Sequence, residues 1–251
     1  MRVALIEGMS TSTRTNDQER GLVAEGLVAR ARWVWYGMRP IWWRSWWGLR
    51  VSGLENLPKN GAMIFCGNHT SHLDAAAILA ALPKKIALEV TTVAARDVWG
   101  ERPMRRLIGR VTTNSVSLSR KGEFAAGFRM LDKVLGEGRP IIIFPEGKRS
   151  VSGEMGEFKP GAAMLAVRNG APIVPVRIEG AYEVMPTSRM VPESGEIKVS
   201  FGKPIWPQQF VAEERGEKKR AFARIMEQLK ERIIGLRPMA DRNVRPTTDP
   251  Q

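Results

Sequence analysis

Phe65-Cys66-Gly67-Asn68-His69-Thr70-Ser71-His72-Leu73-Asp74 joins an apolar run that begins at residue 62 to a helix-forming run over residues 75–82. This order predicts a buried strand, a tight turn and a helix. Because such turns lie at the end of a sheet, where side chains face solvent or substrate, we expect His69 and Asp74 to be presented there.

A histidine followed by a nearby carboxylate suits proton transfer from a hydroxyl. Imidazole titrates near neutrality, and a carboxylate on one ring nitrogen fixes the tautomer and stabilises the charged ring. Positions i and i+5 share no helical face, so the two side chains meet only if His69 lies in the turn and Asp74 in the first helical turn. The chain has two histidines, so His72 is the other candidate, and we expect it to be structural. The simpler alternative is a helix-capping turn with two surface histidines.

A second stretch, Ile141-Ile142-Ile143-Phe144-Pro145-Glu146-Gly147-Lys148-Arg149-Ser150, predicts another buried strand ending in a polar turn. Proline stops the strand, glycine permits unusual backbone angles, and the two cations that follow are donors suited to a phosphate. This turn is therefore a candidate anion site.

Together these turns resemble two motifs of the glycerolipid acyltransferases. Residues 68–74 match their His-four-residues-Asp motif, and residues 144–150 are similar to Phe-Pro-Glu-Gly-Thr-Arg-Ser, with Lys148 in place of threonine. Residues 158–161 and 173–176 resemble two further blocks, in the family's order. The resemblance covers about residues 49–236 and is closest to the bacterial 1-acylglycerol-3-phosphate acyltransferases.

The resemblance implies a mixed β-sheet flanked by helices, an α/β fold, and transfer of a fatty acyl group from a thioester to the free hydroxyl of a lysophospholipid. His69 would remove the hydroxyl proton and Asp74 would orient it. Arg120 and Arg149 would bind the acceptor phosphate, and Glu146 and Gly147 would shape that pocket. Acyl-coenzyme A or acyl carrier protein would be the donor, with no further cofactor. We expect backbone N–H groups near the first turn to hold the oxyanion.

One block departs from the family pattern. Where the family has glycine and phenylalanine before the conserved arginine, this chain has Asn114 and Ser117, although Arg120 is kept. Because the block holds the acceptor head group in the family, a lyso-aminolipid remains an alternative to 1-acylglycerol-3-phosphate.

The net charge of +13 calls for an anionic partner. Six of the eight tryptophans lie within residues 33–47, and residues 26–50 hold five arginines and no acidic residue. Trp42, Trp43, Trp46 and Trp47 are spaced to share one helical face, which indicates an interfacial amphipathic segment. We expect a peripheral or monotopic protein on an anionic membrane, at its cytoplasmic face. The alternative is that these tryptophans pack on the catalytic core.

The sequence predicts a chain of three regions. Residues 1–48 form the N-terminal amphipathic segment, with a polar lead to about residue 17 and a helix over 18–38 that Pro40 ends or kinks. Residues 49–236 form the acyltransferase domain, in which we expect helices over 75–82, 123–135, 159–169 and 217–236, and strands over 85–93, 111–118, 172–178 and 197–201. Residues 237–251 form a polar tail, which we expect to be disordered.

Two rival functions remain open. A metal hydrolase would use His69, His72 and Asp74 as ligands, although no further cluster of ligands is evident and we expect no metal. A non-catalytic basic binding protein would explain the charge and the tryptophans but not the four ordered motifs. No zinc finger or RNA-binding signature is present, so we do not expect nucleic acid as a partner. No signal peptide or apolar run long enough to span a membrane is evident. Cys66, the one cysteine, is expected to be a buried structural thiol.

Overall fold

In the computed structural model, which describes residues 4–95, 107, 111–118, 124–189, 191–215 and 217–236, seven strands form one sheet with the order β1-β7-β6-β2-β5-β3-β4. The strands are β1 Arg50–Ser52, β2 Ile64–Gly67, β3 Thr91–Ala95, β4 Ser115–Leu118, β5 Ile141–Ile143, β6 Ile173–Glu179 and β7 Lys198–Phe201. β6 and β7 pair antiparallel and the other neighbours pair parallel, which confirms the expected mixed sheet.

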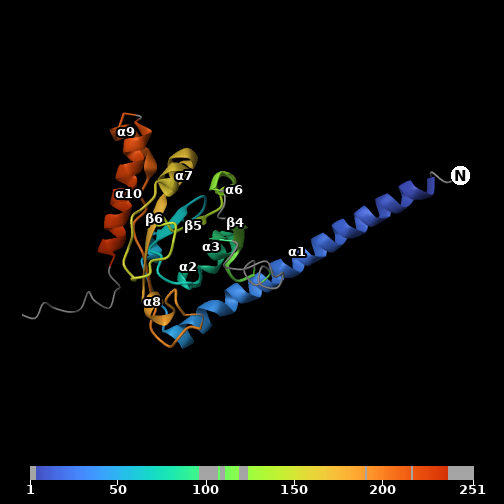
Figure 1. Cartoon of the computed structure of the whole chain (residues 1–251), viewed down its shortest axis with the longest axis horizontal. Coiled ribbons are helices and arrows are strands. Elements are labelled where there is room, and N and C mark those ends of the chain that lie inside the picture. The colour runs from blue at the N-terminus through green and yellow to red at the C-terminus, as the bar shows by residue number, and fades with distance from the viewer. Residues whose placement is uncertain are drawn as a thin grey trace, which may run out of the picture.

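Helices cover both faces of this sheet (Figure 1). They are α1 Ala4–Trp47, α2 Asp74–Ala81, α3 Lys84–Glu89, α6 Phe124–Gly136, α7 Gly161–Asn169, α8 Ala181–Val184, α9 Pro207–Glu213 and α10 Lys218–Gly235, with a 3-10 turn, η1, at Leu54–Asn56. Side chains of α1 and α2 pack in one core cluster, and those of α6, α7 and α10 in a second. Along β2 the two cores alternate, because Ile64 and Cys66 face the second cluster while Phe65 faces the first.

Several predicted helices are confirmed. α2, α6, α7 and α10 lie within about two residues of the expected ranges. α7 ends where Gly170 adopts a left-handed conformation (φ +62°), as glycine does at many helix ends. α10 buries one stripe, which includes Ile225, Leu229 and Ile233.

The expected strand over residues 85–93 is wrong in its first half. Pro83 precedes a helix, α3, built from the helix formers of Lys-Lys-Ile-Ala-Leu-Glu, and the strand begins only at Thr91. In the same way, residues 111–113 are helical and β4 begins at Ser115. Short elements such as β1, η1 and α9 were not predicted, because they carry too few residues to show a period.

Pro175 lies in an interior strand rather than at an edge. β6 pairs with β2 on one side and with β7 on the other, but the ladder with β7 begins only at Val176. Beyond it the Pro175 carbonyl accepts a hydrogen bond from the Gly202 N–H at 2.8 Å. Proline lacks an N–H, and at position 175 none is needed, because the regular ladder with β7 does not extend to this residue.

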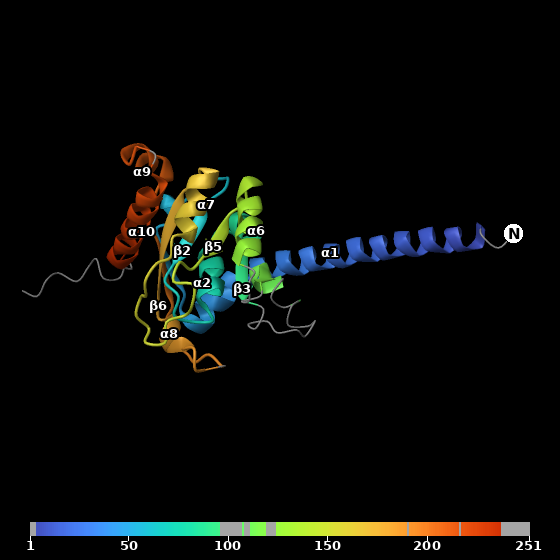
Figure 2. The same cartoon turned by 45° about the horizontal axis from the view of Figure 1, so that its top comes forward.

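α1 is a single helix of 44 residues with Pro40 inside it, instead of a polar lead followed by a helix that ends at the proline. Its C-terminal part packs on the domain through Tyr36, Trp43 and Trp47, which belong to the first core cluster. Its N-terminal part projects away from the sheet (Figure 2). The core of the domain therefore extends N-terminal to the expected boundary at residue 48. The tail over residues 237–251 lies outside the described residues.

Candidate active site

The first turn is fixed to the sheet by Asn68. Its amide nitrogen donates to the Ile178 carbonyl and its amide oxygen accepts the Ile178 N–H, each at 2.9 Å. This two-way pairing on β6 holds the chain as it leaves β2. Sequence reasoning missed this role, because an asparagine before the histidine fits equally well as a helix cap.

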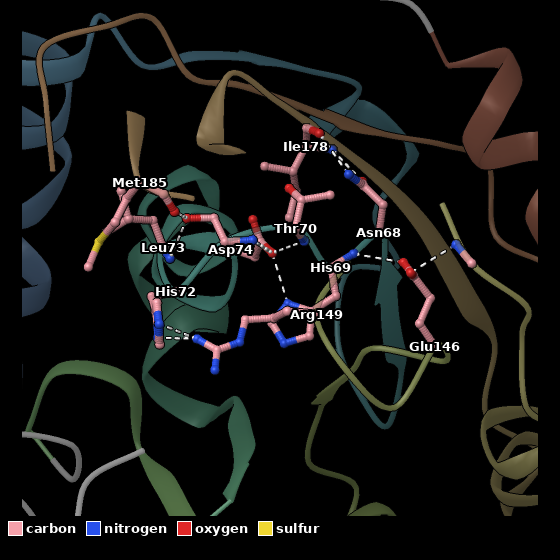
Figure 3. A network of polar contacts seen from close by, with 12 residues as sticks. Asn68, His69, Thr70, His72, Leu73, Asp74, Glu146, Arg149, Ile178 and Met185 are labelled. Carbon is pink, nitrogen blue, oxygen red and sulfur yellow. Dashed lines mark hydrogen bonds and ion pairs between the residues drawn. The ribbon is translucent and has the colours of Figure 1, made fainter. Parts of the chain in front are cut away.

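His69 and Asp74 meet as expected. The Nδ1–H of His69 donates to Oδ2 of Asp74 at 2.8 Å (Figure 3). Asp74 is fully buried at the first residue of α2, and the same oxygen accepts the N–H groups of Thr70 and Ser71 at 2.7 and 2.8 Å. The carboxylate therefore fixes both the turn and the ring, and leaves Nε2 of the imidazole as the basic nitrogen.

The second turn supports the first. The Phe144 ring stacks on the His69 ring, with centroids 4.0 Å apart. The His69 N–H donates to Oε1 of Glu146 at 2.9 Å, and Oε2 accepts the Gly156 N–H at 3.0 Å. Glu146 is only 6% exposed. Since each of its oxygens accepts an N–H of the protein, Glu146 holds the main chain of the site, and its predicted substrate-binding role stays a prediction.

Gly147 forms the tight part of this turn. It has φ +72°, and its N–H donates to the Phe144 carbonyl at 3.0 Å. A Cβ at this position would lie 3.1 Å from Nζ of Lys159, which crosses the turn. The backbone angle favours glycine here, and a larger residue would also have to displace the end of the Lys159 side chain, which agrees with a role in shaping the pocket.

Arg149 lies against His72. Its guanidinium donates to the imidazole of His72, and Figure 3 shows both side chains with His69 at the same end of the sheet. Burial, followed by the charge of Arg149, lowers the pKa of His72, so this ring is neutral near pH 7 and can accept the hydrogen bond. Arg120, the other predicted phosphate ligand, lies outside the described residues.

Four backbone N–H groups of the first turn, where we expect the oxyanion donors, have partners within the protein. The N–H of His69 is bound by Glu146, and those of Thr70 and Ser71 are bound by Asp74. The N–H of Leu73 donates to Oγ of Ser71. These four groups of the first turn are therefore engaged within the protein, and an oxyanion site made of other backbone N–H groups near this turn stays a prediction.

Asn114, which replaces a family glycine, adopts a left-handed conformation with φ +46°. Asparagine tolerates this region better than most residues, which explains why it can stand for glycine here. Its amide nitrogen also donates to the Val90 carbonyl at 2.8 Å. The substitution thus keeps a backbone that glycine would allow.

The four tryptophans do not share one exposed face. Trp43 and Trp47 are 2% and 3% exposed within the core, whereas Trp42 and Trp46 are 46% and 61% exposed. Our membrane-docking assignment is therefore wrong for Trp43 and Trp47. The outer side of α1 carries further exposed apolar residues that we did not predict: Leu27, Val34, Met38 and Ile41.

Two further predictions concern reactive groups. Burial raises the pKa of the Cys66 thiol, so it is a neutral core residue, as expected. Within the described part of the chain, no group of three or more His, Cys, Asp or Glu side chains is arranged to hold a metal ion. The ring of His72 faces a guanidinium instead of converging with His69 and Asp74.

No helix among the described residues is both long and apolar enough to cross a membrane.

The fold and the site are those of the Acyltransferase family. Residues 48–179, more than half of the chain, match the family model described as Acyltransferase, and the chain belongs to this family. It is similar to a solved 1-acyl-sn-glycerophosphate acyltransferase, PlsC, from Thermotoga maritima, with 27% identity and a TM-score of 0.57, covering 85% of this chain and 84% of that one.

Two curated relatives also carry the name of 1-acyl-sn-glycerol-3-phosphate acyltransferase. The chloroplastic 1-acyl-sn-glycerol-3-phosphate acyltransferase BAT2 of Brassica napus is 30% identical over 62% of this chain and 44% of its own length. A probable 1-acyl-sn-glycerol-3-phosphate acyltransferase of Mycoplasma pneumoniae is 30% identical over 62% of this chain and 61% of its own. The matched region thus spans about half of the curated relatives' length.

Proposed function

We propose that this protein transfers a fatty acyl group from a thioester to the free hydroxyl of 1-acylglycerol-3-phosphate, giving phosphatidic acid. The observation that carries the proposal is the buried Asp74 carboxylate on Nδ1 of His69, beside Arg149, in a chain of the acyltransferase family. The names of the relatives support this acceptor.

The reaction needs one base. Nε2 of His69 takes the proton of the acceptor hydroxyl, and the oxygen attacks the thioester carbonyl carbon to form a C–O bond. Collapse of the tetrahedral intermediate breaks the C–S bond, and the leaving sulfur takes the proton from His69. Asp74 stabilises the imidazolium between these steps. The ester, a free thiol and neutral His69 are the products.

The acceptor phosphate would be bound by the cationic side chains of the second turn. Arg149 presents a planar set of donors that matches phosphate geometry, and Lys148 is exposed beside it. The resemblance to the family adds Arg120 as a further ligand of the acceptor phosphate. Acyl-coenzyme A or acyl carrier protein supplies the acyl chain, and the proposed reaction uses no other cofactor and no metal.

The membrane contact is assigned to the outer side of α1. Trp42 and Trp46 adjoin the exposed apolar residues of this helix, and the arginines at 30 and 44 supply positive charge. Tryptophan and arginine together favour the interface of an anionic membrane. We propose peripheral binding at the cytoplasmic face, which would bring the site to its lipid acceptor.

The test is product analysis by mass spectrometry. The purified protein is given a panel of lysolipids, including lysophosphatidic acid and a lyso-aminolipid, with either acyl-coenzyme A or acyl carrier protein as donor. Phosphatidic acid as the main product supports the proposal. Acylation of the lyso-aminolipid alone would overturn the acceptor, and no acylation with either donor would favour the non-catalytic binding protein.

A further inference from the structure

The carboxylate of Glu146 joins two separate parts of the site. One oxygen accepts the N–H of His69 at 2.9 Å, and the other accepts the N–H of Gly156 at 3.0 Å (Figure 3). The side chain is buried. One carboxylate thus connects the turn after β2 to the loop that follows β5.

The main chain of His69 is held entirely by that second region. Its N–H is bound by Glu146, and its carbonyl accepts the N–H of Ser150 at 2.8 Å. The side chain of His69 is fixed by Asp74, but its backbone is fixed by residues about 80 positions later in the chain. A shift of residues 144–156 would therefore move the imidazole relative to the acceptor.

The loop is also held at its outer part. The Val151 carbonyl accepts the hydroxyl of Tyr182 at 2.8 Å, and Gly153 packs against the same tyrosine ring. At Gly156 a Cβ would lie 3.2 Å from Oε2 of Glu146, so the backbone approaches the carboxylate too closely for a larger residue without adjustment. The loop is therefore anchored on one side by Tyr182 and on the other by Glu146.

We infer that Glu146 is a positioning residue that ties the placement of residues 150–156 to the orientation of His69. The inference rests on the proposed function. It assigns Glu146 no contact with substrate. Its effect passes through the backbone of His69 to the base nitrogen, where an error of about 1 Å costs about 100-fold in rate.

Glu146→Gln tests this assignment. The amide keeps one acceptor oxygen but places an NH2 donor against the other backbone N–H, so one of the two hydrogen bonds is lost. We expect kcat to fall about 10- to 100-fold, while KM for the lysolipid acceptor changes by less than about two-fold. The matched control is Glu154→Gln, which removes the same charge from an exposed position in the same loop and should leave both constants unchanged.

A second readout does not depend on turnover. The chain has two histidines, so ¹⁵N spectra show two imidazoles, and His72→Gln assigns them. In the wild-type protein His69 should be held as its Nδ1–H tautomer, and in Glu146→Gln the two tautomers should become more evenly populated. If the wild-type protein lacks acyl transfer but this change still occurs, the proposed function fails and the positioning role stands.

Two results would overturn the inference. If Glu146→Gln lowers the melting temperature but keeps kcat and the His69 spectrum of the wild type, Glu146 only stabilises the fold. If KM rises and the spectrum is unchanged, Glu146 binds the substrate. Should Glu146→Gln fail to fold, Gly156→Ala is the milder test, because its Cβ displaces only Oε2, and it should change the spectrum and kcat in the same direction to a smaller extent.

Discussion

The His69 imidazole stacks on the Phe144 ring, with centroids 4.0 Å apart and planes 12° from parallel. Phe144 directly follows β5, and His69 lies just after β2, the neighbouring strand. The two sequence motifs therefore build one site, because parallel strands bring their carboxyl ends to the same edge of the sheet. The flat contact also limits how far the ring can rotate once Asp74 holds Nδ1.

Replacing the stacked ring should lower activity without removing the base. In Phe144→Leu the core volume is largely kept, but the flat support under His69 is lost. We expect kcat to fall by about two- to twelve-fold, which corresponds to the roughly 0.5–1.5 kcal/mol of an aromatic pair. Steady-state kinetics measures it, and Phe144→Tyr, which keeps the ring, should stay close to the wild type. Equal losses in both variants would show that stacking is not the relevant contact.

Asp74→Asn should be far more damaging. Oδ2 of Asp74 accepts three N–H groups, so an amide either turns its nitrogen toward these donors or places it at Oδ1, which is buried without a hydrogen-bond partner. We expect the transfer rate to fall about 100- to 10,000-fold, through loss of the correct tautomer. Unfolding by urea should show a loss of about 1–3 kcal/mol, because in either orientation a buried N–H or NH2 group is left without an acceptor. Wild-type stability in this variant would contradict the observed network.

The pair of His72 and Arg149 predicts a pH dependence. Burial and then Arg149 lower the pKa of His72 below its ordinary value of 6.5, so the unfolded chain binds the proton more readily than the folded protein. The contribution of this pair is therefore fully present above about pH 6.5 and is lost as pH falls below it. In Arg149→Gln the pKa of His72 should rise part of the way toward 6.5, since burial remains.

Titration of the two imidazoles by NMR measures this shift. Lys148→Gln is the control, because it removes a neighbouring exposed cation that does not touch the ring. An unchanged pKa of His72 in Arg149→Gln would mean that the guanidinium is not held against the ring in solution.

Membrane binding should depend on the exposed tryptophans of α1 and not on the buried ones. Substituting both Trp42 and Trp46 by serine should weaken binding to vesicles with anionic lipid by roughly ten-fold or more. The variant lacks the exposed apolar area of the two tryptophans that the bilayer would bury. Trp206→Ser is the matched control: this tryptophan is 50% exposed beside α9, at the other end of the domain from the C-terminal part of α1 (Figure 1).

Co-sedimentation with vesicles measures this binding. Deleting residues 1–48 would be a poor test, because it also removes Tyr36, Trp43 and Trp47 from the core. Equal binding of the double variant and the wild type would locate the membrane contact elsewhere.

The sequence predicted the contact between His69 and Asp74 because the strand–turn–helix pattern leaves few ways to place two residues five positions apart. It did not predict the role of Glu146, because a motif names residue types but not the direction of their hydrogen bonds. The error on Trp43 and Trp47 has a different cause. α1 is apolar on its inner and outer sides, so periodicity alone cannot tell which tryptophans meet the core.

Residues 85–90 show a further limit. Their composition fits a helix, but Ile86, Leu88 and Val90 also alternate as in a strand, and a segment of six residues is too short for period to decide. At Asn114 the sequence suggests a larger change than the structure shows. The departure from glycine led us to keep an alternative acceptor, but the backbone there has the left-handed conformation that glycine also adopts.

The most direct measurement is the rate of acyl transfer by His69→Ala with lysophosphatidic acid and an acyl thioester, at equal folded concentration confirmed by circular dichroism. If Nε2 of His69 is the base, the rate should fall by a factor of about 100 to about 10,000, with little change in vesicle binding. A transfer rate near that of the wild type would contradict the assignment of His69 and, with it, the role given to Asp74.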